Sequence, residues 1–399
     1  MSTYHPQSVC ILGRQPALGL AELESIYGAT NVSPIAPQVA GLSLHASEVD
    51  FARLGGSTRV AHIMATLPTT DWKAIERRLP ELIVELALTL PDGKVQLGLS
   101  AFGLQVTPGK LNAAGLTLKK ILRSKLERSV RVTPNPEPEL NTAQVLHNHL
   151  TGPTGIEILL IAANNGETIV ARTTEVQDID GYTIRDRGRP KRDARVGMLP
   201  PKLAQIIINL ASNNTPSANS TVLDPFCGTG VVLQEALLIG YNAYGTDLEQ
   251  RMIDYSETNL EWFTGSNAVS GSYRLEVGDA TTLQWQQPVD IVAGETYLGR
   301  PFTERPSSEV VAKTASEVNL ILKKFLRNIH GQLKPGTRLC LAVPAWRIGT
   351  SQFKHLPLID QLSDMGYNRT RFERVRDEQL LYYREDQIVA RQLLVLTRK

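Results

Sequence analysis

The sequence contains few cysteines, and their positions exclude two kinds of site. Among 399 residues only Cys10, Cys227 and Cys340 carry thiols, and no two of them form a C-x-x-C pair. Three widely separated cysteines exclude a disulfide framework and a cysteine-ligated zinc site, and they are typical of a protein in a reducing compartment. We therefore expect no metal centre.

Long apolar runs and an excess of one charge are absent as well. No apolar run approaches the ~20 residues needed to cross a bilayer, and the first residues, MSTYHPQSVC, lack the basic start and apolar core of a signal peptide. The sequence therefore predicts a cytoplasmic protein without a membrane partner. The 42 basic and 40 acidic side chains give a net charge of +2, so an argument for nucleic-acid binding must rest on local clusters.

What is present is the composition of a folded protein with more than one domain. Hydrophobic residues make up 42% and charged residues 21% of the chain, which excludes wholesale disorder. The length predicts two or three domains. The first half mixes helical and strand patterns, which predicts one or two α+β sandwiches. Helices are expected there at 19–27, 71–89 and 116–128, and strands at 94–99 and 155–163.

A regular alternation of strands and helices begins after residue 200. It predicts a doubly wound, mostly parallel sheet with its ligand at the carboxyl ends of the strands. Pro201 is expected in the first turn of a helix that runs through 202–210. Further helices are expected at 231–239, 250–263, 309–330 and 356–365. Strands are expected at 220–223, 242–246, 273–277, 289–293 and 338–343, with a closing hairpin over 379–384 and 387–397.

The segment after the first of these strands carries the most specific pattern. It reads Asp224-Pro225-Phe226-Cys227-Gly228-Thr229-Gly230 and leads into a helix. Glycines let the backbone turn sharply and approach a ligand, and the helix offers free N–H groups. A P-loop would end in G-K-[ST], whereas Val231 follows here, and Leu233 stands where a dinucleotide loop has its third glycine. The remaining interpretation is a nucleoside cofactor without a pyrophosphate.

Acidic residues follow the next two strands. Asp247, with Leu248 after it, is placed to accept hydrogen bonds from ribose hydroxyls, and Asp279, with Ala280 after it, from an adenine amino group. The glycine loop and these two acids together resemble the class I S-adenosylmethionine-dependent methyltransferases. The alternative is that both acids cap strand ends.

The particular loop D-P-F-C-G-T-G is typical of methyltransferases that act on exocyclic amines of nucleic acid bases. Cys227 permits another interpretation, a nucleophile of the kind that attacks pyrimidine rings. Its position in the loop favours a small core residue instead, as does the apolar strand around Cys340.

The segment after the fourth strand is the expected target-amine site. Methylation of an exocyclic amine requires acceptors for both amine protons, so that the lone pair points at the methyl group, and positioning supplies much of the rate. Enzymes of this type carry [DN]-P-P-[YFW] there, which provides an acceptor, a rigid carbonyl and a stacking ring. Glu295, Thr296 and Tyr297 occupy these places, and we expect them to be catalytic, although Thr296 lacks the fixed φ of proline. The alternatives are a degenerate site, a differently specific site or ordinary strand-end residues.

Two local clusters of basic residues indicate nucleic-acid binding. Seven Lys and Arg stand between Lys110 and Arg131 against Glu127 alone, and seven stand between Arg185 and Lys202 against two acids. Phosphate contacts of such residues would dominate affinity and make it salt-dependent. The alternative is a solvated helix face and a solvated linker. The expected RNA contacts are Lys119, Lys120, Arg123, Lys125, Arg185, Arg187, Arg189, Lys191 and Arg192.

The segments that contain these clusters resemble a known family. T-L-K-K-I-L-R-S-K-L, followed by N-P-E-P-E-L and a strand, resembles a THUMP domain, which is an RNA-binding module. G-Y-T-I-R-D-R-G-R-P-K-R-D-A-R-V-G-M-L-P-P-K-L-A-Q-I-I-I-N-L-A, with the glycine loop after it, is similar to the linker and catalytic opening of the tRNA guanine-N2 methyltransferases, which modify guanosine 10 of tRNA. The resemblance covers about residues 111–399, and residues 13–27 are similar to the start of the family's chains.

The resemblance implies a cofactor, a partner and a domain order. S-adenosylmethionine is the implied cofactor, bordered by Met198 and Pro200, and tRNA is the implied partner, whose target base is flipped out into the site. One branch of the family requires a small accessory protein; we expect a monomer. The implied domains are an N-terminal α+β subdomain (1–70), a THUMP-like domain (71–177), a basic linker that lies toward the tRNA (178–199) and a methyltransferase domain (200–399).

Two hypotheses remain open at this point. The first is a methyltransferase that acts on N2 of a tRNA guanosine, or on another RNA or DNA base amine. The second is a tRNA-binding protein that keeps the cofactor site but transfers no methyl group, because the segment at Glu295 departs from the family pattern. Binding without turnover would separate them.

Overall fold

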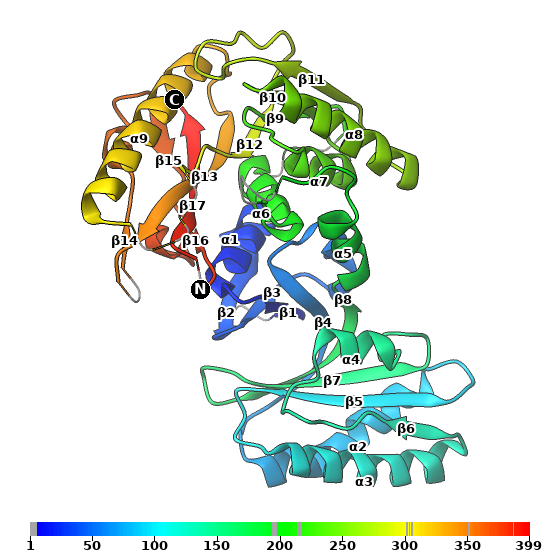
Figure 1. The fold of residues 1–399 in the computed structure, drawn as a ribbon. Helices are drawn as coiled ribbons and strands as arrows, with labels where there is room; N and C mark the ends of the chain where they lie inside the picture. Colours follow the sequence, from blue (N-terminus) through cyan, green and yellow to red (C-terminus); the bar gives the residue numbers. More distant parts are fainter. Residues whose placement is uncertain are drawn as a thin grey trace. The chain divides into compact units, whose positions relative to one another are not determined.

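The chain folds into two compact units, each with its own sheet and core (Figure 1). The computed structural model describes residues 6–193, 198–213, 215, 218–300, 302, 304, 306–349, 352–385 and 387–399. The predicted α/β class with a doubly wound C-terminal sheet is confirmed. No helix within these ranges is long and apolar enough to cross a bilayer. The first unit comprises Met1–Pro16, Thr30–Ala52 and Ser57–Ile179, and the second comprises Ala17–Ala29, Arg53–Gly56 and Asp180–Lys399.

The first unit is built on one eight-stranded sheet in the order β2-β3-β1-β4-β8-β7-β5-β6. β5 runs parallel to β6 and β7, and the other neighbours are antiparallel. Because β4 pairs with β8, the segments expected as separate domains, 1–70 and 71–177, share this sheet. The strands are β1 (Ser8–Leu12), β2 (Val32–Ala36), β3 (Val39–Leu42), β4 (Ser57–Leu67), β5 (Val95–Phe102), β6 (Val130–Val132), β7 (Gly155–Ala162) and β8 (Thr168–Val176).

Amphipathic helices cover part of this sheet. α2 (Trp72–Leu88) begins where the Asp71 side chain accepts a hydrogen bond from Ala74 N at 2.9 Å, and α3 (Pro108–Leu126) begins with a proline, which needs no N–H there. The apolar stripes of both helices pack with β5 and β7 in one core. A shorter helix, α4 (Thr142–His147), lies between β6 and β7 in the chain.

The second unit is built on a mostly parallel sheet whose main path is β11-β10-β9-β12-β13-β17-β15. The strands from β11 to β13 are parallel to their neighbours, and β17 is antiparallel to β13 and β15. The winding reverses between β9 and β12, the place where open α/β sheets bind ligands. The strands are β9 (Thr221–Asp224), β10 (Asn242–Asp247), β11 (Tyr273–Val277), β12 (Ile291–Glu295), β13 (Arg338–Arg347), β14 (Phe353–Lys354), β15 (Tyr367–Arg369), β16 (Leu381–Tyr382) and β17 (Val389–Arg398).

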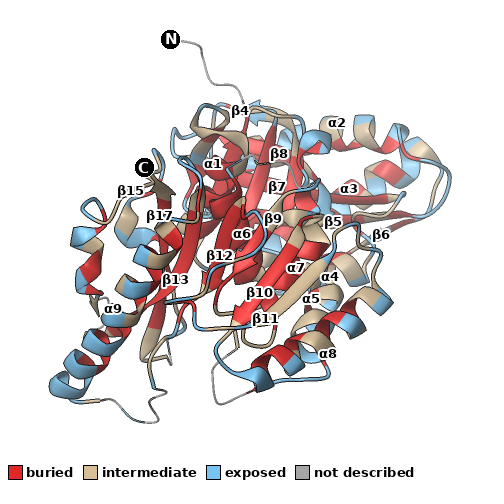
Figure 2. Cartoon of the chain, turned by 90° about the horizontal axis from the view of Figure 1, so that it is seen from above, coloured by how far each residue is buried: buried red, intermediate tan, exposed pale blue. Residues whose placement is uncertain are grey.

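Helices cover both faces of this sheet, and its central strands are buried almost throughout (Figure 2). α6 contacts β12, β13 and β17, α7 contacts β9 and β10, and α8 contacts β10 and β11; α7 also contacts both α6 and α8, so the three form one layer. α9 packs against the opposite face, where its apolar residues share one core cluster with β12, β13 and β17. The helices are α5 (Ile179–Arg187), α6 (Pro201–Ser212), α7 (Val231–Ile239), α8 (Gln250–Ser266) and α9 (Ser308–His330).

Two predictions near the C-terminus have different outcomes. The closing hairpin is confirmed in the antiparallel pairing of β16 with β17. The helix expected over 356–365 was wrong: the segment forms a short 3-10 helix, Pro357–Gln361, followed by turns. Leu358 and Leu362 are buried there, so the apolar spacing reflects packing of a compact loop, and Gly366 ends it with φ of +87°.

α1 (Pro16–Tyr27) belongs almost entirely to the second unit, although it lies near the start of the chain. The carboxylate of Glu22 accepts hydrogen bonds from Gly55 N at 2.9 Å, from Gly56 N at 2.8 Å and from Asn209 Nδ2 of α6 at 2.8 Å. Glu22 is completely buried, and this burial raises its pKa to about 7. One side chain thus joins α1, the 53–56 segment and α6.

The free energy of unfolding should depend on pH through the ionisation of the Glu22 carboxyl group. Its pKa is raised from 4.5 to about 7 in the folded protein, so between these values the folded state keeps a proton that the unfolded chain has released. The resulting stabilisation is complete below pH 4.5 and is lost as the pH rises through 7. In urea unfolding between pH 4.5 and 8, Glu22→Gln should flatten the fall in stability by up to about 1.4 kcal/mol per pH unit. If Glu22→Gln left the slope of the free energy of unfolding against pH unchanged, the raised pKa of Glu22 would be refuted.

Candidate active site

The glycine loop joins β9 to α7 and is held by neighbouring elements. Cys227 N donates a hydrogen bond to Thr246 O of β10 at 2.9 Å, and Ser256 Oγ of α8 donates to Gly228 O at 2.8 Å. Gly228 and Gly230 adopt φ of +52° and +82°, a region that favours glycine. The loop therefore presents its backbone at the carboxyl end of β9, directly before the N-terminus of α7.

Asp247 ends β10 beside this loop. Its Oδ2 accepts a hydrogen bond from Gly228 N and its Oδ1 accepts one from Glu249 N, each at 3.0 Å. Burial raises the pKa of Asp247. Both oxygens are held in place and each retains a lone pair for a further donor. The neighbouring Leu248 is 69% exposed, so an apolar surface lies next to the carboxylate.

Asp279 follows β11, at the same end of the sheet. Its Oδ1 accepts a hydrogen bond from Thr281 N at 2.8 Å, and the residue is exposed. Ala280 is buried in the core below α9. Asp279 therefore makes the hydrogen bond of a strand-end cap and also lies where a ligand at the carboxyl ends of the strands could meet it.

Asp224 is the most deeply buried acid of the site, at 2% exposure. Its Oδ1 accepts a hydrogen bond from Phe226 N at 3.1 Å. Burial raises the pKa of Asp224 well above its usual value, and the charges of Asp247 and Glu295 raise it further. A Cβ at Gly294 would overlap Asp224 Oδ1, so β12 can lie beside this carboxylate only with a glycine there. No group of side chains suited to holding a metal ion occurs in the described ranges.

Glu295 ends β12 and forms an ion pair with Arg391 of β17. Arg391 Nε donates to Glu295 Oε1, and the two side chains are 6% (Arg391) and 15% (Glu295) exposed. Burial raises the pKa of Glu295, and Arg391 opposes that rise. Thr296 donates from N and from Oγ1 to Ala342 O, at 3.0 and 3.3 Å, and Tyr297 is 44% exposed. An acceptor, a constrained backbone and an exposed ring thus occupy the three predicted positions.

Two arginines of the expected basic linker contact the interior of the second unit. Arg185 Nε lies 2.8 Å from Oε1 of Glu235 in α7, and burial raises the pKa of Glu235 to about 7 although Arg185 opposes the rise. Arg189 is 3% exposed, and its Nη1 donates to Thr229 Oγ1 at 3.2 Å. We therefore assign these two residues to the support of the loop and of α7, not to a solvent-facing surface.

The backbone of the same segment is tied to α8. Lys191 N donates to Asn259 Oδ1 at 2.9 Å, and Asn259 Nδ2 donates to Lys191 O at 3.0 Å and to Thr229 O at 2.9 Å. Arg189 Nη2 also donates to Met198 Sδ at 3.7 Å, which places Met198, two residues before Pro200, near the loop as the family resemblance implies. The side chains of Arg187, Lys191 and Arg192 are exposed, and Arg195 of the same cluster lies outside the described residues.

The thiol of Cys227 is not available as a nucleophile. Cys227 is 5% exposed, and burial, with the negative charges of Asp224 and Asp247, raises its pKa well above the usual value. A thiol must ionise to attack. The structure therefore supports the interpretation of Cys227 as a small core residue.

Thiol labelling should confirm this conclusion. All three cysteines are free and buried, so the native protein is expected to react with fewer than about 0.1 equivalents of a thiol reagent at pH 7.5, and with three equivalents after unfolding. Rapid labelling of Cys227 in the native protein would contradict the buried assignment.

Comparison with known proteins shows a similarity to nucleic acid methylases over part of the chain. The model of the N6/N4 methylase family, described as DNA methylase, matches residues 175–258, which contain the glycine loop and Asp247. The chain is 32% identical over 151 residues to the tRNA (guanine(10)-N2)-dimethyltransferase of Methanothermobacter thermautotrophicus, and 33% identical over 175 residues to that of Pyrococcus abyssi. The aligned part of the chain is thus similar in sequence to the tRNA (guanine(10)-N2)-dimethyltransferases.

These alignments cover 37% and 43% of this chain but only 39% and 46% of the two relatives, less than half of their length. Solved structures extend the likeness of fold to the whole chain. TrmN from Thermus thermophilus matches 99% of this chain and 100% of its own, with a TM-score of 0.51 and 17% identity. The structure of SMU.472 complexed with SAH matches 100% of this chain and 99% of its own, with a TM-score of 0.52 and 12% identity.

Sequence reasoning missed four residues that support the site: Ser256, Asn259, Glu235 and Arg391. Their partners lie 28, 30, 50 and 96 residues away in the chain. One signal was available for Arg391, because it precedes the apolar run of β17 at a position where the strand is buried. The other three are polar residues on helix faces and carry no distinguishing local pattern.

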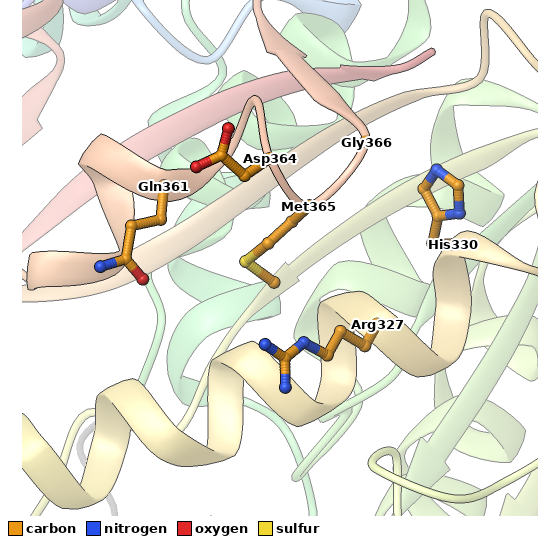
Figure 3. Close-up of a pocket in the computed structure, with 6 residues that line it drawn as sticks. All are labelled: Arg327, His330, Gln361, Asp364, Met365 and Gly366. Atoms are coloured by element: carbon orange, nitrogen blue, oxygen red, sulfur yellow. The ribbon is translucent and has the colours of Figure 1, made fainter.

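A cavity of about 440 Å³ lies elsewhere in the second unit. Arg327 and His330, near the C-terminal end of α9, face the 361–366 segment across it (Figure 3). Gly366 and β15 lie next to the end of β17, which pairs with the first residue of β13. The cavity is therefore at the amino ends of the parallel strands, opposite the glycine loop and Glu295.

Proposed function

We propose that the protein transfers a methyl group from S-adenosylmethionine to N2 of a tRNA guanosine. The observation that carries the proposal is the position of Glu295: an acceptor at the carboxyl end of β12, beside Asp224 and the glycine loop, where the winding of the sheet reverses. The relationship to tRNA (guanine(10)-N2)-dimethyltransferases supports the choice of base and of atom.

The residues at the loop fit a cationic nucleoside better than a nucleotide. The Asp247 carboxylate, which is held beside the loop by two backbone N–H groups, would repel a phosphate and attract the positive charge of S-adenosylmethionine. The positive-φ glycines allow close approach of the backbone, Asp247 and Asp279 can accept from ribose and adenine, and Leu248 offers apolar contact. When bound, the cofactor supplies an electrophilic methyl group. Further contacts are assigned to Pro225, Phe226, Cys227, Thr229, Ala280, Met198 and Pro200.

The target amine would be oriented by the three residues after β12. Glu295 accepts from an N2–H, the backbone at Thr296 is held by its two hydrogen bonds to Ala342 O, and Tyr297 stacks on the flipped base. Because burial raises the pKa of Glu295, this carboxylate is also suited to take the proton that the amine loses.

A second candidate function is tRNA and cofactor binding without turnover. The ion pair with Arg391 favours it, because a carboxylate that already accepts a hydrogen bond has fewer lone pairs for a substrate. In either case we propose that the protein acts in the cytoplasm as a monomer; a small accessory protein is the alternative to a protein that acts alone.

The test is to incubate the purified protein with unmodified tRNA transcripts and radiolabelled S-adenosylmethionine, and then to analyse the nucleosides. N2-methylguanosine or its dimethyl form is expected. Cofactor binding without transfer to any tRNA would favour the second candidate or a missing accessory protein. Label in another nucleoside would refute the choice of guanosine N2.

The exposed side chains on α3 should make tRNA binding salt-dependent. Lys120, Arg123 and Lys125 are exposed and Lys119 is partly exposed on this helix. Replacing Lys120, Arg123 and Lys125 by alanine is expected to reduce the slope of log K against log[salt] by about 2 to 3, because each phosphate contact contributes about 0.7 to 0.9. The measurement is a filter-binding titration between ~50 and ~200 mM salt.

The matched control removes three exposed charges from α2 of the same unit, with alanine at Lys73, Arg77 and Arg78. It should change the slope by less than about 1, since only the net charge changes. Equal changes of the slope in both triple variants would show that only the net charge matters. They would refute the prediction that the α3 side chains contact phosphates.

A further inference from the structure

Arg391 and Glu295 lie on the same face of the second sheet because of the strand registers. Glu295 pairs with Ala342 between β12 and β13, and Arg391 pairs with Pro344 between β13 and β17. Ala342 and Pro344 are two residues apart in one strand, so their side chains point to the same face. Arg391 thus reaches across β13 to Glu295, at the end of the sheet that carries the glycine loop.

The two side chains keep hydrogen-bonding atoms that are not used within the described chain. The pair is joined through Arg391 Nε and Glu295 Oε1. Among the described residues, neither Nη atom of Arg391 nor Glu295 Oε2 has a hydrogen-bond partner, and none of the three is fully enclosed. The site therefore offers a carboxylate oxygen and guanidinium N–H groups side by side, and the exposed Tyr297 follows Glu295 by two residues in the chain.

The Watson–Crick edge of guanine has the complementary pattern. It presents the N2 amine and N1–H as neighbouring donors, followed by the acceptor O6. Flipped bases are recognised through this edge. On the basis of the proposed function, we propose that Glu295 accepts from the N2 and N1 protons of the target guanine while Arg391 donates to O6, so that this pair selects guanine.

The same arrangement disfavours the other amine-bearing bases. Adenine and cytosine each present a ring-nitrogen acceptor next to their amine, and that lone pair would face the carboxylate of Glu295. A mismatched hydrogen-bond pair of this kind costs about 1 to 3 kcal/mol, or about 5- to 150-fold in rate. If the ion pair only stabilised the fold, it would not discriminate guanine from adenine or cytosine.

The experiment compares guanine with 2-aminopurine at the nucleotide that the wild-type protein methylates. 2-Aminopurine keeps the N2 amine but lacks O6 and the N1 proton. Wild-type protein should methylate it about 5- to 150-fold more slowly in single turnover. Arg391→Met should slow methylation of guanine by at least about 10-fold and of 2-aminopurine by less than about threefold. Arg391→Lys, which keeps a donor and the charge, should recover part of the rate with guanine.

Three outcomes would overturn the inference. Equal rates of the wild-type protein on both bases need no variant and would show that neither O6 nor the N1 proton is read. Equal losses on both bases in Arg391→Met, with an unchanged melting temperature, would make Arg391 a residue that only positions Glu295. Absence of methylation on any tRNA by the wild-type protein would refute the proposed function itself, and the inference with it.

Discussion

Replacing Glu295 with alanine is expected to lower the single-turnover rate of methyl transfer to tRNA by about 10²- to 10³-fold. The substitution removes the acceptor that orients the amine, and it leaves the glycine loop and Asp247 unchanged. Binding of S-adenosylhomocysteine, measured by calorimetry, should therefore stay within about threefold of wild type. The rate is measured with saturating protein and the tRNA species identified in the nucleoside analysis.

Two further variants make this result interpretable. Glu295→Ala leaves Arg391 buried without its counter-charge, so the melting temperature is measured in parallel, and Glu295→Gln, which keeps an acceptor oxygen, should lose less activity. Glu309→Ala, at an exposed residue of α9, is the matched control and should leave the rate unchanged. A rate within twofold of wild type for Glu295→Ala would remove Glu295 from the mechanism.

Replacing Glu157 with alanine is expected to lower the free energy of unfolding of the first unit by about 3 to 5 kcal/mol. Glu157 has no exposed surface and accepts hydrogen bonds from Arg59 Nη1 at 2.5 Å, Ser100 Oγ at 2.7 Å and Thr173 Oγ1 at 2.7 Å. Alanine would leave the 4% exposed Arg59 without its counter-charge and two hydroxyl donors without an acceptor. Urea unfolding followed by circular dichroism measures the loss.

A surface ion pair of the same unit provides the comparison. Arg78 and Glu81 of α2 are 2.9 Å apart, and their side chains are 56% and 65% exposed. Glu81→Ala is expected to cost less than about 1 kcal/mol, because solvent screens exposed pairs. Similar small losses in Glu157→Ala and Glu81→Ala would show that the buried network does not stabilise the first unit.

The local structure that was predicted correctly around the candidate site is the part encoded within a few residues. The apolar strand β9, the glycines that adopt positive φ and the apolar face of α7 are consecutive in the chain, and each reports a local conformational preference. The positions of Asp247, Asp279 and Glu295 after their strands follow from the same local periodicity, because parallel strands of one sheet end at a common edge.

The helix expected over 356–365 shows where such reasoning fails. Its apolar residues are spaced as on a helix, yet Leu358 and Leu362 are buried by a loop that packs on α9, and Asn319 Oδ1 of α9 accepts from Leu358 N at 2.8 Å. A short apolar pattern reports which residues are buried and leaves the backbone conformation to the neighbours.

By itself the sequence determined the α/β alternation, the glycine loop and the order of the acids, since these depend on local backbone and burial preferences. Only the tertiary structure decided which charges meet. Arg391 finds Glu295 through the strand order β12-β13-β17, Arg185 and Arg189 turn inward because Glu235 and Thr229 lie beneath them, and Glu22 ties α1 to α6. Partners of this kind depend on strand register and helix packing between distant segments, so a local pattern can mark a buried charge such as Arg391 but does not identify its partner.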